Sequence, residues 1–595
     1  MKNLSRFSSK IFFVSLLFLL LSNILVVDNS LYKGVVWGKY FWAIVWLYIA
    51  VIVTCVLLFI GKIAFVWKKN DYYIISVLIY LILHAILRNS GSILLYSDLF
   101  VLCLLFYILR YCNFVFSGIN YFLILLAVVV SIWGVMQYFH LIGSYNINYE
   151  VVGPFFNPAL FAAFISAVSP LVTFRLVSLM KKKENQDNVK NYFFFQVAYL
   201  VIILIFLTAL VLSCNRAALL AFFITNVALM LTYTGKISLI IKSKLCVLSI
   251  ISLTLLFMIA LYLLNVDSAD GRLFVWSLSL KGIINNPFGI GLGKFSSFLA
   301  NSQESYFRDN GLDRFADIAD YSLYAFNDLL QYTLELGWLF GFMVLSILFY
   351  TVYIALKERK YALLACLINL CITSFFSYTL HQLSFLILFV FIVSEILYLH
   401  DINVFYKKYN LNIVRLIILL PMMSIIVLAY QKRKEYEGYK LANEAHAAYK
   451  FGDYSSAIHL YKLSTMSVKS NYVMKLEYAE SLFNEKRYDE SFLIFSDVSH
   501  YDGNPLIYCF LGKIHQIYDN KELAIFNYQK AMYILPNRFR PYLYLSQLYY
   551  EVGDYGKAIL VADLGLAIRP KVKSEIVIDI LNNLKLVKSK ALERI

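Results

Sequence analysis

The stretch YFFFQVAYLVIILIFLTALVLSCNRAALLAFFITNVALMLTY (192–233) decides the fold class. It holds two apolar runs, 192–213 and 216–233, each close to the roughly 20 residues with which a helix crosses a hydrocarbon layer of about 30 Å. Only Ser213-Cys214-Asn215-Arg216 lies at the junction of the runs, and only a very short turn fits there. We therefore predict a hairpin of membrane helices with Arg216 at one membrane surface.

Similar apolar runs fill most of the first 430 residues. Hydrophobic residues make up 61% of the 595 residues and charged residues 15%, whereas soluble domains are near half apolar and a quarter charged. We predict about thirteen membrane helices in all. Their expected spans are 11–27, 41–61, 72–88, 93–110, 119–141, 158–178, 192–213, 216–233, 244–265, 331–355, 361–377, 381–399 and 412–430.

The basic residues indicate how these helices are oriented. With the N-terminus inside, the strong basic clusters of the membrane part fall on one side, as the positive-inside rule requires. They are Lys62 with Lys68 and Lys69, Lys181–Lys183, Lys236 with Lys242 and Lys244, Lys357 with Arg359 and Lys360, and Lys407 with Lys408. The longest loop, 266–330, falls outside, and an odd number of spans also places everything after Tyr430 outside. Because the net charge of +16 lies largely in these clusters, it does not indicate a nucleic-acid partner.

The segment from Gln431 onward is charged, helix-prone and repetitive. Similar residues recur at a spacing close to 34: Tyr454, Ala457 and Tyr461; Tyr488, Ser491 and Phe495; Ala524, Tyr528 and Pro536; Tyr555, Ala558, Ala562 and Pro570. This pattern resembles tetratricopeptide repeats over about 434–570, with a generic helical bundle as the alternative. We therefore expect an all-α chain: a polytopic membrane domain, 1–431, followed by a soluble helical-repeat domain, 432–595, that binds a protein partner.

Two polar sites on the expected outer side precede the loop 266–330. Gly153-Pro154-Phe155-Phe156-Asn157-Pro158 opens the sixth span, where Asn157 can cap the helix and offer a polar group. Arg216 opens the eighth span, and its permanent charge suits a phosphate, although an arginine that only snorkels to the interface explains it as well.

Two further polar sites lie in or beside that loop. Arg272 and Trp276 are four residues apart and share a face if helical, and a glycine run, Asn286–Gly293, follows them. Asn327, Gln331 and Glu335 would form one polar stripe at the mouth of an apolar helix, with a capped helix start facing water as the alternative. The eight cysteines are scattered without a CxxC pair, and no metal or cofactor motif stands out.

Four sequence motifs, in their order along about residues 120–400, resemble those of the O-antigen ligase superfamily. They are Gly-x-Phe-x-Asn-Pro, Ser-x-x-Arg, Arg-x-x-x-Trp with Asn-Pro-x-Gly-x-Gly, and Asn-Asp-x-x-Gln-x-x-x-Glu-x-Gly. The superfamily includes O-antigen ligases, bacterial protein O-oligosaccharyltransferases and some glycan polymerases, and members with C-terminal tetratricopeptide repeats are familiar. The resemblance implies a GT-C-like, metal-independent transferase in the bacterial inner membrane. It would use a glycan on undecaprenyl diphosphate at the periplasmic face, with the N-terminus cytoplasmic and the repeats periplasmic.

The resemblance also implies roles for residues. Arg216 and Arg272 match the arginines that grip the diphosphate, and Asn327, Gln331 and Glu335 match the outer-loop motif. We further expect Asn157, Trp276 and Tyr378 to contact substrate.

One position departs from the family. Phe326 stands where the family commonly has a histidine before the asparagine, so another group must take the proton of the acceptor. Asp328, Glu335 and His381 are the candidates.

The expected reaction is inverting transfer of the glycan to a hydroxyl acceptor. Lipid A core, a Ser or Thr of a secreted protein, or another glycan could supply this hydroxyl, and outward-facing repeats slightly favour a protein. The alternatives are a polysaccharide polymerase, a polysaccharide or lipid transporter, and a non-catalytic membrane scaffold. Against a transporter, no half-to-half repeat is visible and the polar groups gather on one face.

Overall fold

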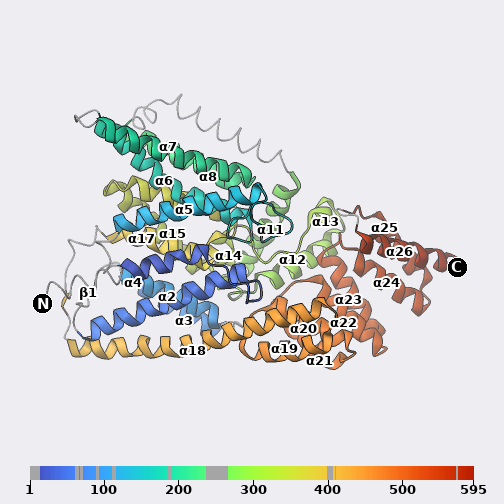
Figure 1. The fold of residues 1–595 in the computed structure, drawn as a ribbon. Coiled ribbons are helices and arrows are strands. Elements are labelled where there is room, and N and C mark those ends of the chain that lie inside the picture. Colours follow the sequence, from blue (N-terminus) through green and yellow to red (C-terminus); the bar gives the residue numbers. More distant parts are fainter. Residues whose placement is uncertain are drawn as a thin grey trace.

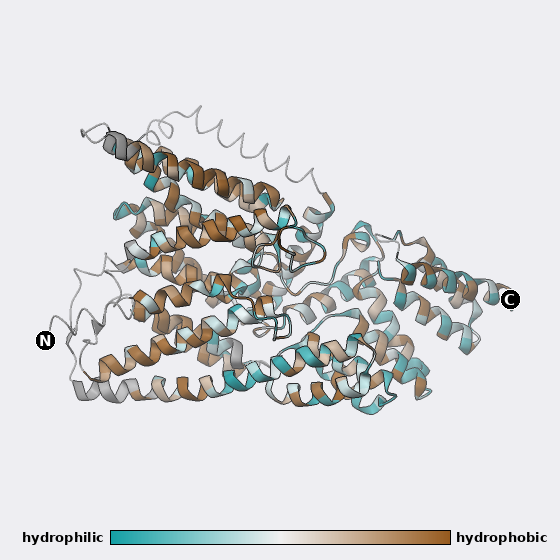
Figure 2. Ribbon diagram, in the orientation of Figure 1, coloured by the Kyte–Doolittle hydropathy of each residue, from teal (hydrophilic) through white to brown (hydrophobic). Residues whose placement is uncertain are grey.

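A computed structural model describes residues 14–60, 66–67, 71–88, 93–109, 116–183, 189–235, 266–398, 407–408, 411–570 and 574–595. In the described part, the secondary-structure elements are helices except for one antiparallel pair of two-residue strands, β1 (Val66–Trp67) and β2 (Lys407–Lys408). The apolar helices form a bundle, and the charged C-terminal helices extend from one end of it (Figures 1 and 2). The predicted all-α class is confirmed.

The bundle follows the expected spans closely. Its helices are η1 (Ser22–Leu25), α2 (Gly34–Phe59), α3 (Asp71–Leu87), α4 (Ile93–Leu109), α5 (Phe116–Tyr138), α6 (Pro158–Lys183), α7 (Val189–Leu212), α8 (Arg216–Tyr233), α15 (Trp338–Lys357), α16 (Tyr361–Phe375) and α17 (Leu383–Tyr398). Within the described residues, six helices are long and apolar enough to cross a membrane: α2, α5, α6, α7, α8 and α15. Five further apolar helices are shorter. The span expected at 244–265 lies outside the described residues, so the count of thirteen stays a prediction.

The span expected at 331–355 is wrong as a single helix. It is two helices, α14 (Asp328–Leu336) and α15, separated at Gly337, whose φ of 90° suits glycine. The glycine run causes the break by binding the backbone at the end of α14: the Ile290 amide donates to the Leu334 oxygen at 3.0 Å, and Gly291 donates to the Glu335 oxygen at 2.9 Å. A side chain on Gly289 would come within 2.4 Å of the Glu335 oxygen, so this approach requires a glycine.

The loop expected at 266–330 is mostly helical. It forms α11 (Val266–Asn285), α12 (Phe295–Asn310) and α13 (Arg314–Ile318). The last predicted span, 412–430, is also wrong in its end, because α18 (Leu411–Lys450) continues for twenty residues beyond Tyr430. No helix-breaking glycine or proline stands at the expected domain boundary, 431/432, which therefore lies inside a helix.

The C-terminal helices form the predicted repeat. They are α19 (Tyr454–Ser467), α20 (Tyr472–Asn484), α21 (Tyr488–Ser499), α22 (Pro505–Ile517), α23 (Lys521–Ile534), α24 (Phe539–Val552), α25 (Tyr555–Ala567) and α26 (Glu575–Leu592). Every second helix begins at 454, 488, 521 and 555, which gives intervals of 34, 33 and 34 residues. Paired helices at this period are the tetratricopeptide arrangement, in which each pair buries its apolar face on the next.

The repeats share a core with α11 and α12, two of the helices formed by residues 266–330. One apolar cluster joins Phe274 and Phe307 of α11 and α12 to Phe495, Ile507 and Ile514 of the repeats. We call α11–α13 together with α19–α26 the repeat lobe.

Polar contacts secure the same joint. Buried Asp502 accepts hydrogen bonds from Tyr321 at 2.9 Å and Ser296 at 3.4 Å. At Gly503 an added Cβ would lie 2.4 Å from the Ser296 oxygen. The repeats therefore pack directly on α12 and on α11, the helix that carries Arg272 and Trp276.

Candidate functional site

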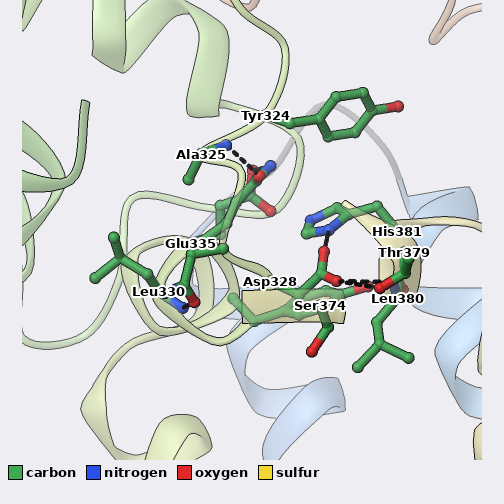
Figure 3. A network of polar contacts seen from close by, with 12 residues as sticks. Tyr324, Ala325, Asp328, Leu330, Glu335, Ser374, Thr379, Leu380 and His381 are labelled. Atoms are coloured by element: carbon green, nitrogen blue, oxygen red, sulfur yellow. Dashed lines mark hydrogen bonds and ion pairs between the residues drawn. The ribbon is translucent and has the colours of Figure 1, made fainter. Parts of the chain in front are cut away.

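The N-terminus of α14 is the centre of a buried polar network (Figure 3). Asn327 caps the helix by accepting the Leu330 amide at 3.0 Å. The next residue, Asp328, is 1% exposed and accepts the amide of Leu380 at 2.8 Å and the hydroxyl of Thr379 at 3.3 Å. The short helix η3 (Thr379–His381) is thereby fixed against α14.

His381 is oriented by three neighbours. Its Nδ1 lies 2.5 Å from an Asp328 carboxylate oxygen (Figure 3). Its ring stacks on Tyr332 at 4.4 Å between centroids and 9° between planes, and meets Tyr324 edge-on at 5.5 Å. Among the described residues its Nε2 is buried and has no hydrogen-bond partner. One ring nitrogen is thus held by a carboxylate, and the hydrogen-bonding capacity of the other is not used by the described residues.

The backbone of Ala325 is held from two sides. The Trp276 indole donates to the Ala325 oxygen at 2.9 Å, and the Ala325 amide donates to Gln331 Oε1 at 2.9 Å. Gln331 also donates to Glu335 at 3.3 Å, so the predicted polar stripe on α14 exists, but it is buried rather than facing water. Burial raises the pKa of Glu335 above its ordinary value, against the opposing effects of the His381 charge and the hydrogen bonds from Gln331 and the Gly293 and Phe295 amides.

Phe326 occupies the position of the family histidine and has a left-handed backbone, with a φ of 53°. Such a conformation is strained for an aromatic residue and occurs mainly where surrounding contacts enforce it. The Arg272 guanidinium lies 5.4 Å from the centre of its ring, and Tyr378 meets that ring edge-on at 6.3 Å. Phe326 therefore positions Arg272 through a cation–π contact.

The two arginines of the prediction are electrostatic neighbours. The pKa of Arg272 is lowered first by burial and second by the positive charge of Arg216. Arg216 begins α8 after the expected tight turn, in which Asn215 caps the helix by accepting the Ala218 amide at 2.9 Å. Arg216 and Arg272, 56 positions apart in the chain, are thus close enough for the charge of one guanidinium to act on the other.

Asn157 joins the network through Tyr378. Asn157 caps α6 as predicted, since it accepts the Ala159 amide at 2.8 Å, and its side chain is hydrogen-bonded to Tyr378. Tyr378 stacks on Tyr324 at 4.2 Å with planes 4° apart. All ten residues singled out from the sequence are therefore linked in one region, although their chemical roles remain predictions.

An apolar cavity of about 410 Å³ lies beside this network. Its walls come from α3, α4, α15, α16 and α17, and it reaches Asn327, Asp328 and Leu380. Phe375, on the same wall, packs edge-on against Trp276 at 5.3 Å. The cavity is thus apolar along the bundle and polar where it meets α14.

Several supporting residues were not foreseen. Tyr324 and Tyr332 enclose His381, and His84 with Tyr96 holds the glycine run: His84 Nδ1 lies 2.7 Å from the Tyr96 hydroxyl, and Nε2 lies 3.0 Å from the Phe288 oxygen. His84 lies within an apolar span, which is the signal that could have marked it. Within the described residues, no group of three or more His, Cys, Asp or Glu side chains could hold a metal ion.

Comparison with known structures finds two crystal structures of MamA and the yeast Tom70. The first MamA structure is 18% identical, covers 27% of this chain and 88% of its own, and has a TM-score of 0.22. The second is 19% identical, with 25% and 93% covered and a TM-score of 0.21. Tom70 is 9% identical, with 88% and 94% covered and a TM-score of 0.18. At these scores the likenesses add nothing to the repeat geometry described above.

Comparison with curated proteins finds no significant match. A family model does match: O-antigen ligase, over residues 200–346. The match includes Arg216, Arg272, the glycine run and α14, whereas Asn157, Tyr378 and His381 of the site lie outside it. Residues 200–346 of the chain are therefore similar to the O-antigen ligase family.

Proposed function

We propose that the protein transfers a glycan from undecaprenyl diphosphate to an acceptor hydroxyl at the periplasmic face of a bacterial inner membrane. The observation that carries this proposal is the buried His381–Asp328 pair at the polar end of an apolar cavity. Arg272 packs on Phe326, two residues before Asp328, and lies within reach of the charge of Arg216. The O-antigen ligase match supports glycan transfer in general. In this orientation the N-terminus is cytoplasmic and the repeat lobe is periplasmic.

The arginine pair suits the diphosphate of the donor. Two guanidinium groups near one another repel. A diphosphate bound between them attracts both, and this attraction outweighs the repulsion. When the bond to the sugar breaks, negative charge grows on the departing diphosphate oxygen. Fixed cations then stabilise the transition state more than the ground state, without a metal.

The apolar cavity suits the polyprenyl tail. Its wall is formed mainly by leucines, valines, phenylalanines and other apolar side chains of α3, α4, α15, α16 and α17, and its most polar part is at Asn327 and Asp328. A tail in the cavity would keep the diphosphate near the polar network, so that binding energy far from the reacting atoms positions them.

The geometry favours His381 over Asp328 and Glu335 as proton acceptor. The Asp328 carboxylate already makes three hydrogen bonds, and the Glu335 carboxylate already accepts one from Gln331. In the proposed step the acceptor oxygen attacks the anomeric carbon, and His381 Nε2 takes the hydroxyl proton. The bond between that carbon and the diphosphate oxygen breaks, so undecaprenyl diphosphate leaves and the anomeric configuration inverts.

The acceptor is a protein hydroxyl in this proposal, with lipid A core and another glycan as rivals. Its support is that the repeats share a core with α11, the helix that carries Arg272. A protein held on the repeats would be presented to the site by a rigid joint.

The test is glycan transfer by the purified full-length protein in lipid vesicles, with a polyprenyl-diphosphate glycan and separate protein, lipid A and glycan acceptors. Arg272→Gln and Arg216→Gln should each lower the rate about 100- to 1,000-fold, as loss of one donor to a developing oxyanion does. Arg314→Gln, which changes an exposed arginine of α13, is the matched control and should leave the rate unchanged. Full activity of both site variants would refute the assignment.

A further inference from the structure

A second cavity, of about 240 Å³, lies far from the site, between α5, α6, α16 and α17, and unlike the first it is polar. Its lining includes Asn120, Arg175, Arg359, Lys360 and Glu395. Arg175 follows Asn157 by 18 residues on α6, which at about 1.5 Å per residue is roughly 27 Å. Because this is close to the thickness of a bilayer core, the second cavity lies at the opposite membrane surface.

Cations outnumber carboxylates in this cavity. Among the described residues, Arg175, Arg359 and Lys360 line it with a single acid, Glu395, while the charge of Glu358 acts on Lys360 from nearby. The Lys360 ammonium donates to the main-chain oxygen of Glu395 rather than to its carboxylate. The Arg175 guanidinium is held over the Tyr121 ring, 4.5 Å from its centre. The cavity is therefore suited to an anion that reaches it from the membrane surface.

Two buried acceptors of the same cavity lack partners. Asn120 donates to Glu395 Oε1 at 3.3 Å, yet among the described residues Asn120 Oδ1 and Glu395 Oε2 make no hydrogen bond. Glu395 is 9% exposed, and a buried unpaired carboxylate oxygen is costly. These atoms require donors, which the oxygens of a phosphate diester cannot supply but the hydroxyl groups of an alcohol can.

We propose that this cavity binds the headgroup of a phosphatidylglycerol-type lipid, a phosphodiester that carries free hydroxyls. The diester accepts from Arg175, Arg359 and Lys360, and the glycerol hydroxyls donate to Glu395 and Asn120. Ile124, Leu171, Phe174 and Leu363 form the apolar part of the wall, beside which the acyl chains enter the bilayer. Basic pockets between membrane helices bind anionic headgroups in this way.

The experiment measures lipid retention by native mass spectrometry on the purified full-length protein. Wild type should retain phosphatidylglycerol about tenfold more strongly than phosphatidylcholine, and more strongly than phosphatidic acid, which lacks the glycerol hydroxyls. The double variant Arg175→Gln with Lys360→Gln should reduce the preference over phosphatidylcholine to less than about twofold. Lys181→Gln is the matched control, because Lys181 lies at the same end of α6 but donates to the Tyr233 backbone oxygen.

A second variant tests the hydroxyl contacts separately from the contacts to the phosphodiester. Glu395→Gln removes the carboxylate but keeps a polar group, so the selectivity for phosphatidylglycerol over phosphatidic acid should fall while the preference for anionic lipid persists. Equal retention of anionic and zwitterionic lipids by wild type would overturn the proposal. So would unchanged preference in the double variant, or displacement of the lipid by millimolar inorganic phosphate, which would indicate a simple phosphate site.

Discussion

The candidate site and the repeats are both formed by helices with buried interiors, but they are held together differently. In the repeats, each helix packs mainly on its sequence neighbours, and Tyr461 of α19 and Glu477 of α20 meet through a hydrogen bond of 2.5 Å across a short connection. In the site, His381 depends on Asp328, 53 residues earlier, and Trp276 depends on Ala325, 49 residues later. Loss of one contact in the repeats should therefore disturb only the neighbouring helices. Loss of one contact in the site should disturb the geometry of the whole site.

The largest effect should come from His381→Ala. We expect the transfer rate to fall about 100- to 10,000-fold with little change in KM, because the variant removes the proton acceptor but no donor-binding group. Steady-state kinetics of transfer would measure it. His446→Gln is the control, since His446 pairs with Glu477 in the repeats, and it should retain the wild-type rate. A wild-type rate for His381→Ala would place the base elsewhere.

Two core truncations in the repeats test whether the core shared with α11 and α12 supports the site, while the core of the last repeat helices does not. Ile507→Ala and Leu548→Ala each remove a fully buried side chain and should each cost about 2–5 kcal/mol of local stability. Ile507 belongs to the core shared with α11 and α12, while Leu548 belongs to the core of α23–α26. Only Ile507→Ala should also lower transfer, measured below both thermal transitions. Equal rates for the two variants would show that the repeats do not support the site.

Trp276→Phe should have a smaller effect. The variant keeps an aromatic ring against Phe375 and removes the hydrogen bond to Ala325, worth about 0.5–1.5 kcal/mol. Transfer should fall about two- to tenfold, and the unfolding temperature should fall with it. If the rate fell without any loss of stability, Trp276 would instead contact substrate directly, as the sequence suggested.

Glu335→Gln should have the smallest effect. Burial raises the pKa of Glu335 and so favours its neutral acid, which glutamine imitates in shape. We expect transfer within about threefold of wild type between pH 6 and 8. A loss comparable to that of His381→Ala would identify Glu335 as the base and remove His381 from that role.

Sequence reasoning succeeded where the signal is local. The apolar run of 216–233 became α8 with the same bounds, and the recurrence of Tyr454, Tyr488 and Tyr555 became the starts of α19, α21 and α25. It failed at Gly337, where an apolar run of helical length is divided because the glycine run, about 45 residues earlier, binds the end of α14. It also failed at Tyr430, since nothing in the helix propensity of α18 changes where the apolar surface ends.

The sequence by itself determined the membrane bundle, the repeats and the identity of the polar candidates, because run length, periodicity and residue chemistry are properties of neighbouring residues. Only the tertiary structure decided that His381 is held by Asp328, that Arg272 lies over Phe326 within reach of the Arg216 charge, and that the repeats share a core with α11 and α12. These contacts join segments far apart in the chain. Their selection depends on how whole helices pack, which no local pattern encodes.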